Sequence, residues 1–92
     1  MEVRWSLPAA EDLEHICERI GRDNPEAASR VARTVYEGCA RLKEFPHLGR
    51  ASSRLAGRRE LVFSPLPYIA VYRVTDDAVE ISRIYHGAQD CP

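Results

Sequence analysis

The hydrophobic pattern at the start of the chain changes from that of a strand to that of a helix. Residues 2–6 alternate apolar and polar side chains, which predicts a short strand closed by Pro8. Over Ala9–Ile20 the apolar positions recur at intervals of three and four residues, which is typical of an amphipathic helix. Glu11 and Asp12 are expected in its first turn, where the helix dipole favours acidic groups.

A second helix is predicted over Pro25–Leu42. Asn24 can cap its free amide groups, and a proline at the first helical position loses no hydrogen bond. Only residues 22–24 separate the two helices, so we expect an antiparallel hairpin. The side chains expected to point inward from the two helices are Leu13, Ile16, Ile20, Val31, Val35 and Leu42.

The second half of the chain is typical of strands that follow a loop. Residues 46–57 contain Gly and Ser at several positions and are expected to form the loop. Strands are predicted over Arg58–Ser64, Tyr68–Val74 and Val79–His86, and the middle one is almost continuously apolar, as expected of a central strand. The order β-α-α-β-β-β predicts an α+β fold in which an antiparallel meander carries the helical hairpin on one face.

Length and composition indicate one small domain over residues 1–92. With 45% apolar residues the chain can build a single core of two layers, which leaves no room for a large cofactor site. No apolar run approaches the length of a membrane span, and no signal peptide is recognisable, so a cytoplasmic location is expected. The sequence has no nucleotide-binding or metalloprotease motif, so neither a nucleotide nor a metal cofactor is expected.

Three cysteines are an odd number, and their spacing fits neither a disulfide framework nor a zinc motif. They are expected to be reduced thiols. Cys17 and Cys39 fall on the inward stripes of the helices and should act as small hydrophobic residues. Cys91 lies near the C-terminus, where an exposed thiol could crosslink two chains in air.

Positive charge is concentrated in one stretch of a chain whose net charge is −1. Residues 41–59 carry six basic groups and one acidic group, whereas residues 1–40 and 60–92 each carry a net charge of −3. The overall charge argues against a protein that coats nucleic acid, while the basic stretch suits an acidic or phosphate-bearing partner or a solvated loop. The basic residues of the stretch are Arg41, Lys43, Arg50, Arg54, Arg58 and Arg59.

Five short blocks occur in one order along almost the whole chain. They are Asp23-Asn24-Pro25-Glu26-Ala27-Ala28, Phe45-Pro46-His47-Leu48-Gly49-Arg50, Arg59-Glu60-Leu61, Pro67-Tyr68-Ile69-Ala70-Val71-Tyr72-Arg73-Val74 and Ile84-Tyr85-His86-Gly87-Ala88-Gln89-Asp90. Together they resemble the RelE/ParE superfamily of bacterial toxins from type II toxin–antitoxin modules. The resemblance implies a small toxin held inactive in a hetero-oligomer by a cognate antitoxin, whose extended C-terminal segment wraps around it. It also implies one of two activities, because RelE-like members cut mRNA in the ribosomal A site and ParE-like members poison DNA gyrase.

If the chain is a nuclease, its catalytic candidates are Arg73, Arg83 and His86. Attack by a 2′-hydroxyl group needs a base, an acid for the leaving oxygen and a cation over the phosphate. His86 has a suitable ordinary pKa and matches the place where some nuclease members carry a histidine, although they follow it with Tyr and this chain has Gly87. A turn role for His86, and ion pairs of the two arginines with glutamates on neighbouring strands, are the structural alternatives.

The acidic overall charge favours the ParE-like activity, because nucleases that dock on ribosomal RNA are usually strongly basic. The leading interpretation is therefore a toxin that inhibits DNA gyrase. A ribosome-dependent mRNA endonuclease is the alternative, and a non-toxic module that only binds its antitoxin is a third. The residues expected to bind the target or partner are Arg50, Arg54, Arg58, Arg59, Arg73 and Arg83.

Overall fold

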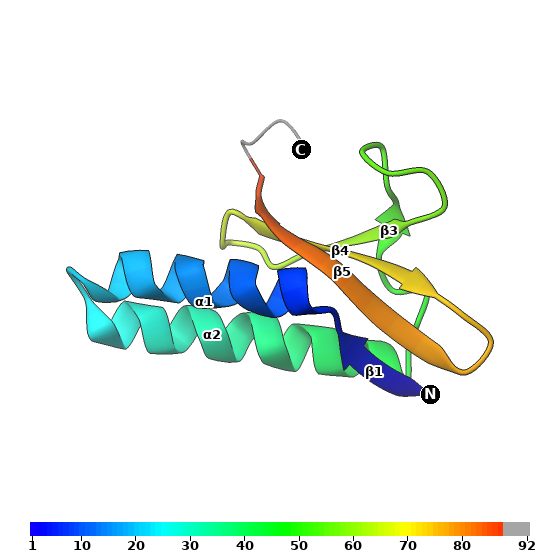
Figure 1. Cartoon of the computed structure of the whole chain (residues 1–92), viewed down its shortest axis with the longest axis horizontal. Helices are drawn as coiled ribbons and strands as arrows, with labels where there is room; N and C mark the ends of the chain where they lie inside the picture. Colours follow the sequence, from blue (N-terminus) through cyan, green and yellow to red (C-terminus); the bar gives the residue numbers. More distant parts are fainter. Residues whose placement is uncertain (88–92) are drawn as a thin grey trace.

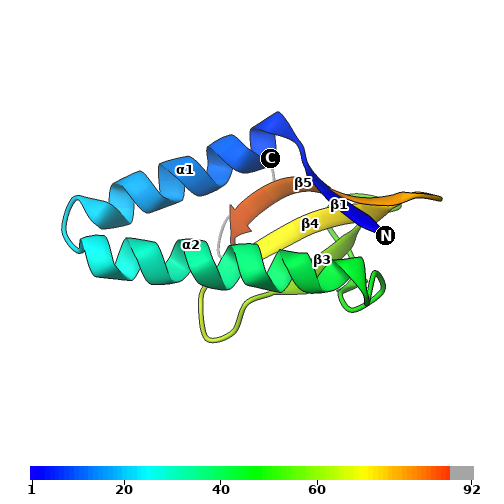
Figure 2. The same ribbon diagram turned by 90° about the horizontal axis from the view of Figure 1, so that it is seen from below.

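Two antiparallel helices lie on one face of a five-stranded sheet in the computed structural model, which describes residues 1–87 (Figure 1). The elements are β1 Glu2–Trp5, α1 Leu7–Gly21, α2 Pro25–Ala40, the 3₁₀ turn η1 Arg41–Lys43, β2 Arg50–Ala51, β3 Arg59–Val62, β4 Tyr68–Val74 and β5 Ala78–His86. The strands are arranged in the order β1-β5-β4-β3-β2. Figure 2 shows the hairpin in front of the sheet, and the predicted α+β class is confirmed.

The sheet differs from the predicted meander in two places. β1 pairs in parallel with β5, with Glu2 opposite Ala78, so the sheet is mixed. Sequence patterning could not set this direction, because no turn joins the two strands. The second difference is β2, which lies inside the predicted loop 46–57 and pairs antiparallel with the start of β3. Two residues are too few to show a strand period.

The first helix begins earlier than its apolar period indicates. Ser6 caps α1, since its Oγ accepts a hydrogen bond from the amide of Ala9 at 3.1 Å, and Pro8 lies in the first helical turn rather than closing the strand. Glu11 and Asp12 therefore lie beyond the first turn. The prediction that they meet the helix dipole is wrong.

The second helix begins where predicted and ends earlier. Asn24 Oδ1 accepts a hydrogen bond from the amide of Ala27 at 3.1 Å, as the capping argument requires. The α-helix stops at Ala40, and η1 carries Leu42 into the core with tighter geometry. Within residues 1–87 neither helix is long and apolar enough to cross a membrane.

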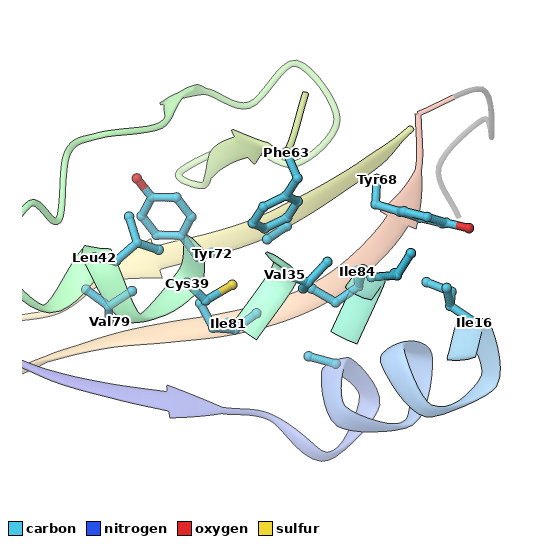
Figure 3. Close-up of a cluster of buried hydrophobic side chains, with 13 residues drawn as sticks. Ile16, Val35, Cys39, Leu42, Phe63, Tyr68, Tyr72, Val79, Ile81 and Ile84 are labelled. Carbon is cyan, nitrogen blue, oxygen red and sulfur yellow. The ribbon is translucent and has the colours of Figure 1, made fainter. Parts of the chain in front are cut away.

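The core lies between the hairpin and the sheet (Figure 3). Of the six side chains predicted to point inward, Ile16, Val31, Val35 and Leu42 are buried, and Leu13 and Ile20 pack partly buried against the same cluster, so this prediction is confirmed. The sheet contributes Tyr68, Ala70, Tyr72, Val79, Ile81 and Ile84, and Phe63 joins them from the position after β3.

The two cysteines of the helices differ in burial. Cys39 is fully buried beside the sheet, and desolvation raises the pKa of its thiol to about 12. Cys17 is half-buried, and burial raises the pKa of its thiol as well. Both act as small apolar residues, as expected. Cys91 lies outside the described residues.

Candidate functional site

The face of the sheet away from the helices, here called the distal face, carries charged side chains in rows. The strand register places Arg4, Glu80 and Arg73 in one row and Glu60, Val71 and Arg83 in the next. Neighbouring positions point to the helices, because side chains alternate along a strand. Two of the three nuclease candidates, Arg73 and Arg83, therefore lie on the distal face.

A buried carboxylate on the distal face holds the basic loop to the sheet. Glu60 is only 2% exposed, and its Oε2 accepts a hydrogen bond from Ser52 Oγ at 2.8 Å. Arg50 Nη2 lies 3.4 Å from its Oε1, and Arg54 Nη1 lies 3.7 Å from its Oε2. Arg54 also donates to the carbonyl oxygen of Gly87 at 3.2 Å. Two arginines predicted to bind a partner thus form ion pairs inside the chain.

Arg59 fastens the turn that contains the Phe45–Arg50 block. Its guanidinium donates to the carbonyl oxygen of Gly49 at 2.6 and 3.0 Å and to that of His47 at 3.2 Å. The hydroxyl of Tyr72 donates to Pro46 O and accepts from the amide of Gly49, both at 2.9 Å. This block of the family resemblance is therefore a turn tied to β3 and β4, and Arg59 is used within the chain.

The arginines of β4 and β5 are ion-paired with different partners. Arg73 Nε lies 2.5 Å from Glu80 Oε1, which matches the predicted pair across the strands. Arg83 instead donates to both carboxylate oxygens of Asp12 on α1, at 2.7 and 3.0 Å. Asp12 also accepts a hydrogen bond from the backbone amide of Ile84 at 3.0 Å. This amide of β5 lies beyond Ile81, the last β5 residue that is paired with β1, so Asp12 takes the place of a strand partner.

His86 lies on the other face of the sheet from these arginines. It is opposite Tyr68, whose ring belongs to the core, and the two rings meet edge to face at 5.6 Å with an interplanar angle of 87°. Arg73 therefore lies apart from His86. Arg83 reaches from its strand to Asp12, which lines the same hollow as His86.

His86 instead borders a small hollow against α1. The hollow has a volume of about 140 Å³, and its polar lining comes from Asp12, His15, Arg19 and His86. Sequence analysis did not pick out His15 or Arg19, although their spacing of four residues on a helix places both on one face. Within residues 1–87 no group of three or more His, Cys, Asp or Glu side chains could hold a metal ion.

An apolar groove lies between α1, α2 and β1, and we call it the hairpin groove. Its volume is about 380 Å³. Trp5 and Tyr36 stack beside it with ring centroids 6.1 Å apart, and Tyr36 is 62% exposed. An exposed aromatic ring beside an apolar groove is typical of a protein-binding surface. The groove is lined by Trp5, Ala10, Leu13, Glu14, Cys17, Ala32 and Tyr36.

A second depression, here called the arginine cleft, lies at the β1 side of the distal face. It has a volume of about 500 Å³ and contains Arg4, Arg58 and Arg73. Arg58 is the predicted binding residue that the structure leaves without an ion pair or side-chain hydrogen bond among residues 1–87. The six predicted arginines are therefore not one patch, because the fold divides them between the Glu60 network, the Phe45–Arg50 turn, the Asp12 pair and this cleft.

Comparisons with known proteins agree with the resemblance in the sequence. A family model described as ParE toxin of type II toxin-antitoxin system, parDE, matches residues 3–91. The chain is 40% identical over 88 residues to toxin RelE2 of Caulobacter vibrioides, with 96% of this chain and 97% of that protein covered. It is 39% identical over 90 residues to Y4kP, a candidate toxin of Sinorhizobium fredii, with 98% and 92% covered.

Two solved structures share the fold. A chain from the chromosomal ParDE toxin–antitoxin system of P. aeruginosa matches with a TM-score of 0.84 and 28% identity, covering 94% of this chain and 95% of that chain. YafQ from E. coli matches with a TM-score of 0.64, covering 95% and 93%. At 16% identity the second match shows the fold alone.

Proposed function

The chain belongs to the ParE toxin family of type II toxin–antitoxin systems, and we propose that this toxin acts by inhibiting DNA gyrase. Gyrase is the target that the resemblance to ParE-like toxins implies. The observation that carries the proposal is the separation of two catalytic candidates, because Arg73 is ion-paired with Glu80 on the distal face and His86 lies on the helix side. Inhibition by contact needs no group that moves a proton.

The hairpin groove is our candidate for the antitoxin site. A type II toxin of this family has an antitoxin partner, and the groove offers an apolar surface that an extended or helical segment can cover. Stacked Trp5 and Tyr36 supply the large aromatic contacts that dominate protein interfaces. We expect apolar side chains of the antitoxin to lie between α1 and α2.

A ribosome-dependent mRNA endonuclease is the second candidate. The hollow beside α1 favours a nuclease, because it is lined by the imidazoles of His15 and His86 and the guanidinium of Arg19. Imidazoles can act as general acid and base, and a guanidinium can stabilise a phosphate. The name of the relative RelE2 points the same way. Against it stand the net charge of −1 and the exposure of His15 and Arg19 to solvent.

The test is a supercoiling assay with purified toxin, gyrase and relaxed plasmid. Our proposal expects loss of supercoiling that adding the antitoxin restores, and filamentous cells with an SOS response when the toxin alone is induced. An abrupt stop in translation with normal gyrase activity would favour the nuclease. Normal growth on induction would indicate a non-toxic module that only binds its antitoxin.

A further inference from the structure

Arg58 has no acceptor for its side chain among residues 1–87, unlike Arg50, Arg54 and Arg59 of the same basic stretch. Its Nε is a buried atom without a hydrogen-bond partner. Its backbone is fixed, because its amide donates to Leu55 O at 3.2 Å and its carbonyl accepts from Ser52 N at 2.8 Å. A buried guanidinium N–H without an acceptor among residues 1–87 is costly, so an acceptor from another molecule would stabilise this position.

The register places a second cation beside it. Arg59 is opposite Tyr72, so the preceding residue, Arg58, lies next to Arg73 at the edge of the β3–β4 ladder, and both line the arginine cleft. Like charges on neighbouring strands destabilise a sheet unless an anion lies between them. Glu80 pairs with Arg73 from the other side and leaves Arg58 without a counter-charge.

The hydroxyl of Ser6, which also lines the cleft, does not serve as a ligand for Arg58. Ser6 Oγ donates to Ser82 O at 2.9 Å and accepts from the amide of Ala9, so its hydroxyl is already used. Apolar surface comes from Trp5, Pro8 and Ile81. The cleft therefore suits a carboxylate on a partly apolar segment, because guanidinium groups bind carboxylates through paired hydrogen bonds.

Neighbouring charges disfavour a nucleic-acid strand in this cleft. Glu80 lines it, Glu2 pairs with Arg4 beside it, and Asp76 and Asp77 form the adjoining β4–β5 turn. A chain of phosphates would meet these acidic groups in succession. For a single carboxylate at Arg58, Glu80 is the acidic residue that lines the same part of the described structure, whereas Arg4 and Arg73 line it as cations.

Trp5 lines both the arginine cleft and the hairpin groove. A segment that leaves the groove over β1 therefore enters the cleft directly. We infer that the arginine cleft binds an aspartate or glutamate side chain of the antitoxin, on the segment whose apolar residues occupy the hairpin groove. This inference rests on the proposed antitoxin site in the groove.

The test compares antitoxin affinity for purified toxin variants at near-physiological salt. Arg58→Ala should weaken binding about 10- to 100-fold, as expected for loss of a charged hydrogen bond, and Arg58→Lys should recover part of it. Arg22→Ala is the matched control, because it removes the same charge at the exposed hairpin turn and should leave affinity unchanged. The free Arg58→Ala toxin should melt no lower than the wild type, since the arginine has no partner to lose.

Substitutions in the antitoxin identify the carboxylate that binds Arg58. Each Asp and Glu of the antitoxin is changed in turn to Asn or Gln. One of these changes should weaken binding to the wild-type toxin as much as Arg58→Ala does. Combining that antitoxin change with Arg58→Ala should cause no further loss of affinity. Unchanged affinity of Arg58→Ala, with Tyr36→Asp weakened, would overturn this inference and leave the groove proposal standing. Unchanged affinity of both variants would overturn both. Loss of growth inhibition in Arg58→Ala at unchanged antitoxin affinity would assign the cleft to the toxin's target and also overturn the inference.

Discussion

Individual buried side chains in this domain are either neutral or supplied with several partners. Glu60 lies beside two guanidiniums and a hydroxyl, whereas Cys39 packs in the apolar core and remains a neutral thiol. Removing a partner of a buried charged group leaves that group uncompensated in a low-dielectric interior. Loss of any one of the contacts to Glu60 is therefore expected to be costly. The thiol has no such partner, and its environment opposes ionisation instead.

Cys39 makes stability depend on pH in the alkaline range. The thiol pKa is raised to about 12 in the folded chain from a reference of 9.0, so the unfolded chain loses the proton first. This contribution to stability is complete below pH 9 and declines as pH rises toward 12. Between pH 8 and pH 10 the wild type should lose about 1 kcal/mol of unfolding free energy that Cys39→Ala does not lose.

Urea unfolding at the two pH values measures this difference. Cys17→Ala is the control, because Cys17 is only half-buried and its desolvation is weaker. It should retain most of the wild-type pH dependence. Equal losses in the wild type and Cys39→Ala would contradict the prediction.

At the scale of elements, the turn before β2 depends on a glycine that must approach the sheet closely. A Cβ at Gly49 would overlap the carbonyl oxygen of Glu60 and would lie 2.9 Å from Cε1 of Tyr72. The same glycine donates its amide to the hydroxyl of Tyr72 and accepts from Arg59. The β2–β3 pairing and the turn therefore cannot both survive a side chain here.

Gly49→Ala should lower the unfolding free energy by about 3 kcal/mol or more, because overpacking and at least one lost hydrogen bond add together. Gly57→Ala is the comparison, since Gly57 has a φ of +75° but open space around its Cα. Only backbone strain opposes that change, at about 1 kcal/mol. Chemical denaturation of both variants measures the two unfolding free energies. Equal decreases for Gly49→Ala and Gly57→Ala would show that close packing at Gly49 does not determine stability.

The sequence predicts an element correctly where the residues that define it lie within a few positions of one another. Asn24 and the apolar period fixed the start of α2 correctly, because both act within one helical turn. Ser6 was a local signal that the strand interpretation of Pro8 concealed. The pair of Asp12 with Arg83 joins residues 71 positions apart, and no pattern within one element can reveal it.

At the scale of the whole molecule, folding redistributes the charge that the sequence concentrates. The stretch 41–59 has a net charge of +5, yet Arg50, Arg54 and Arg59 form contacts inside the chain, whereas Arg58 faces the arginine cleft without a partner among residues 1–87. Sequence analysis predicted the right residue type and overestimated how many such residues are available. The Trp5 side of the domain joins the two candidate binding surfaces, which the linear sequence separates.

The last prediction distinguishes the two activities of the superfamily. If the toxin acts by contact with gyrase, His86→Ala and the double change with His15→Ala should still inhibit growth, because no proton transfer is involved. A nuclease that used these imidazoles would lose about 10²–10⁴-fold in activity. Melting temperatures of both variants must be measured, since His86 packs against Tyr68. Primer extension on mRNA from induced cells gives the answer, and new codon-phased cuts that vanish in His86→Ala would show that the ribosome, and not gyrase, is the target.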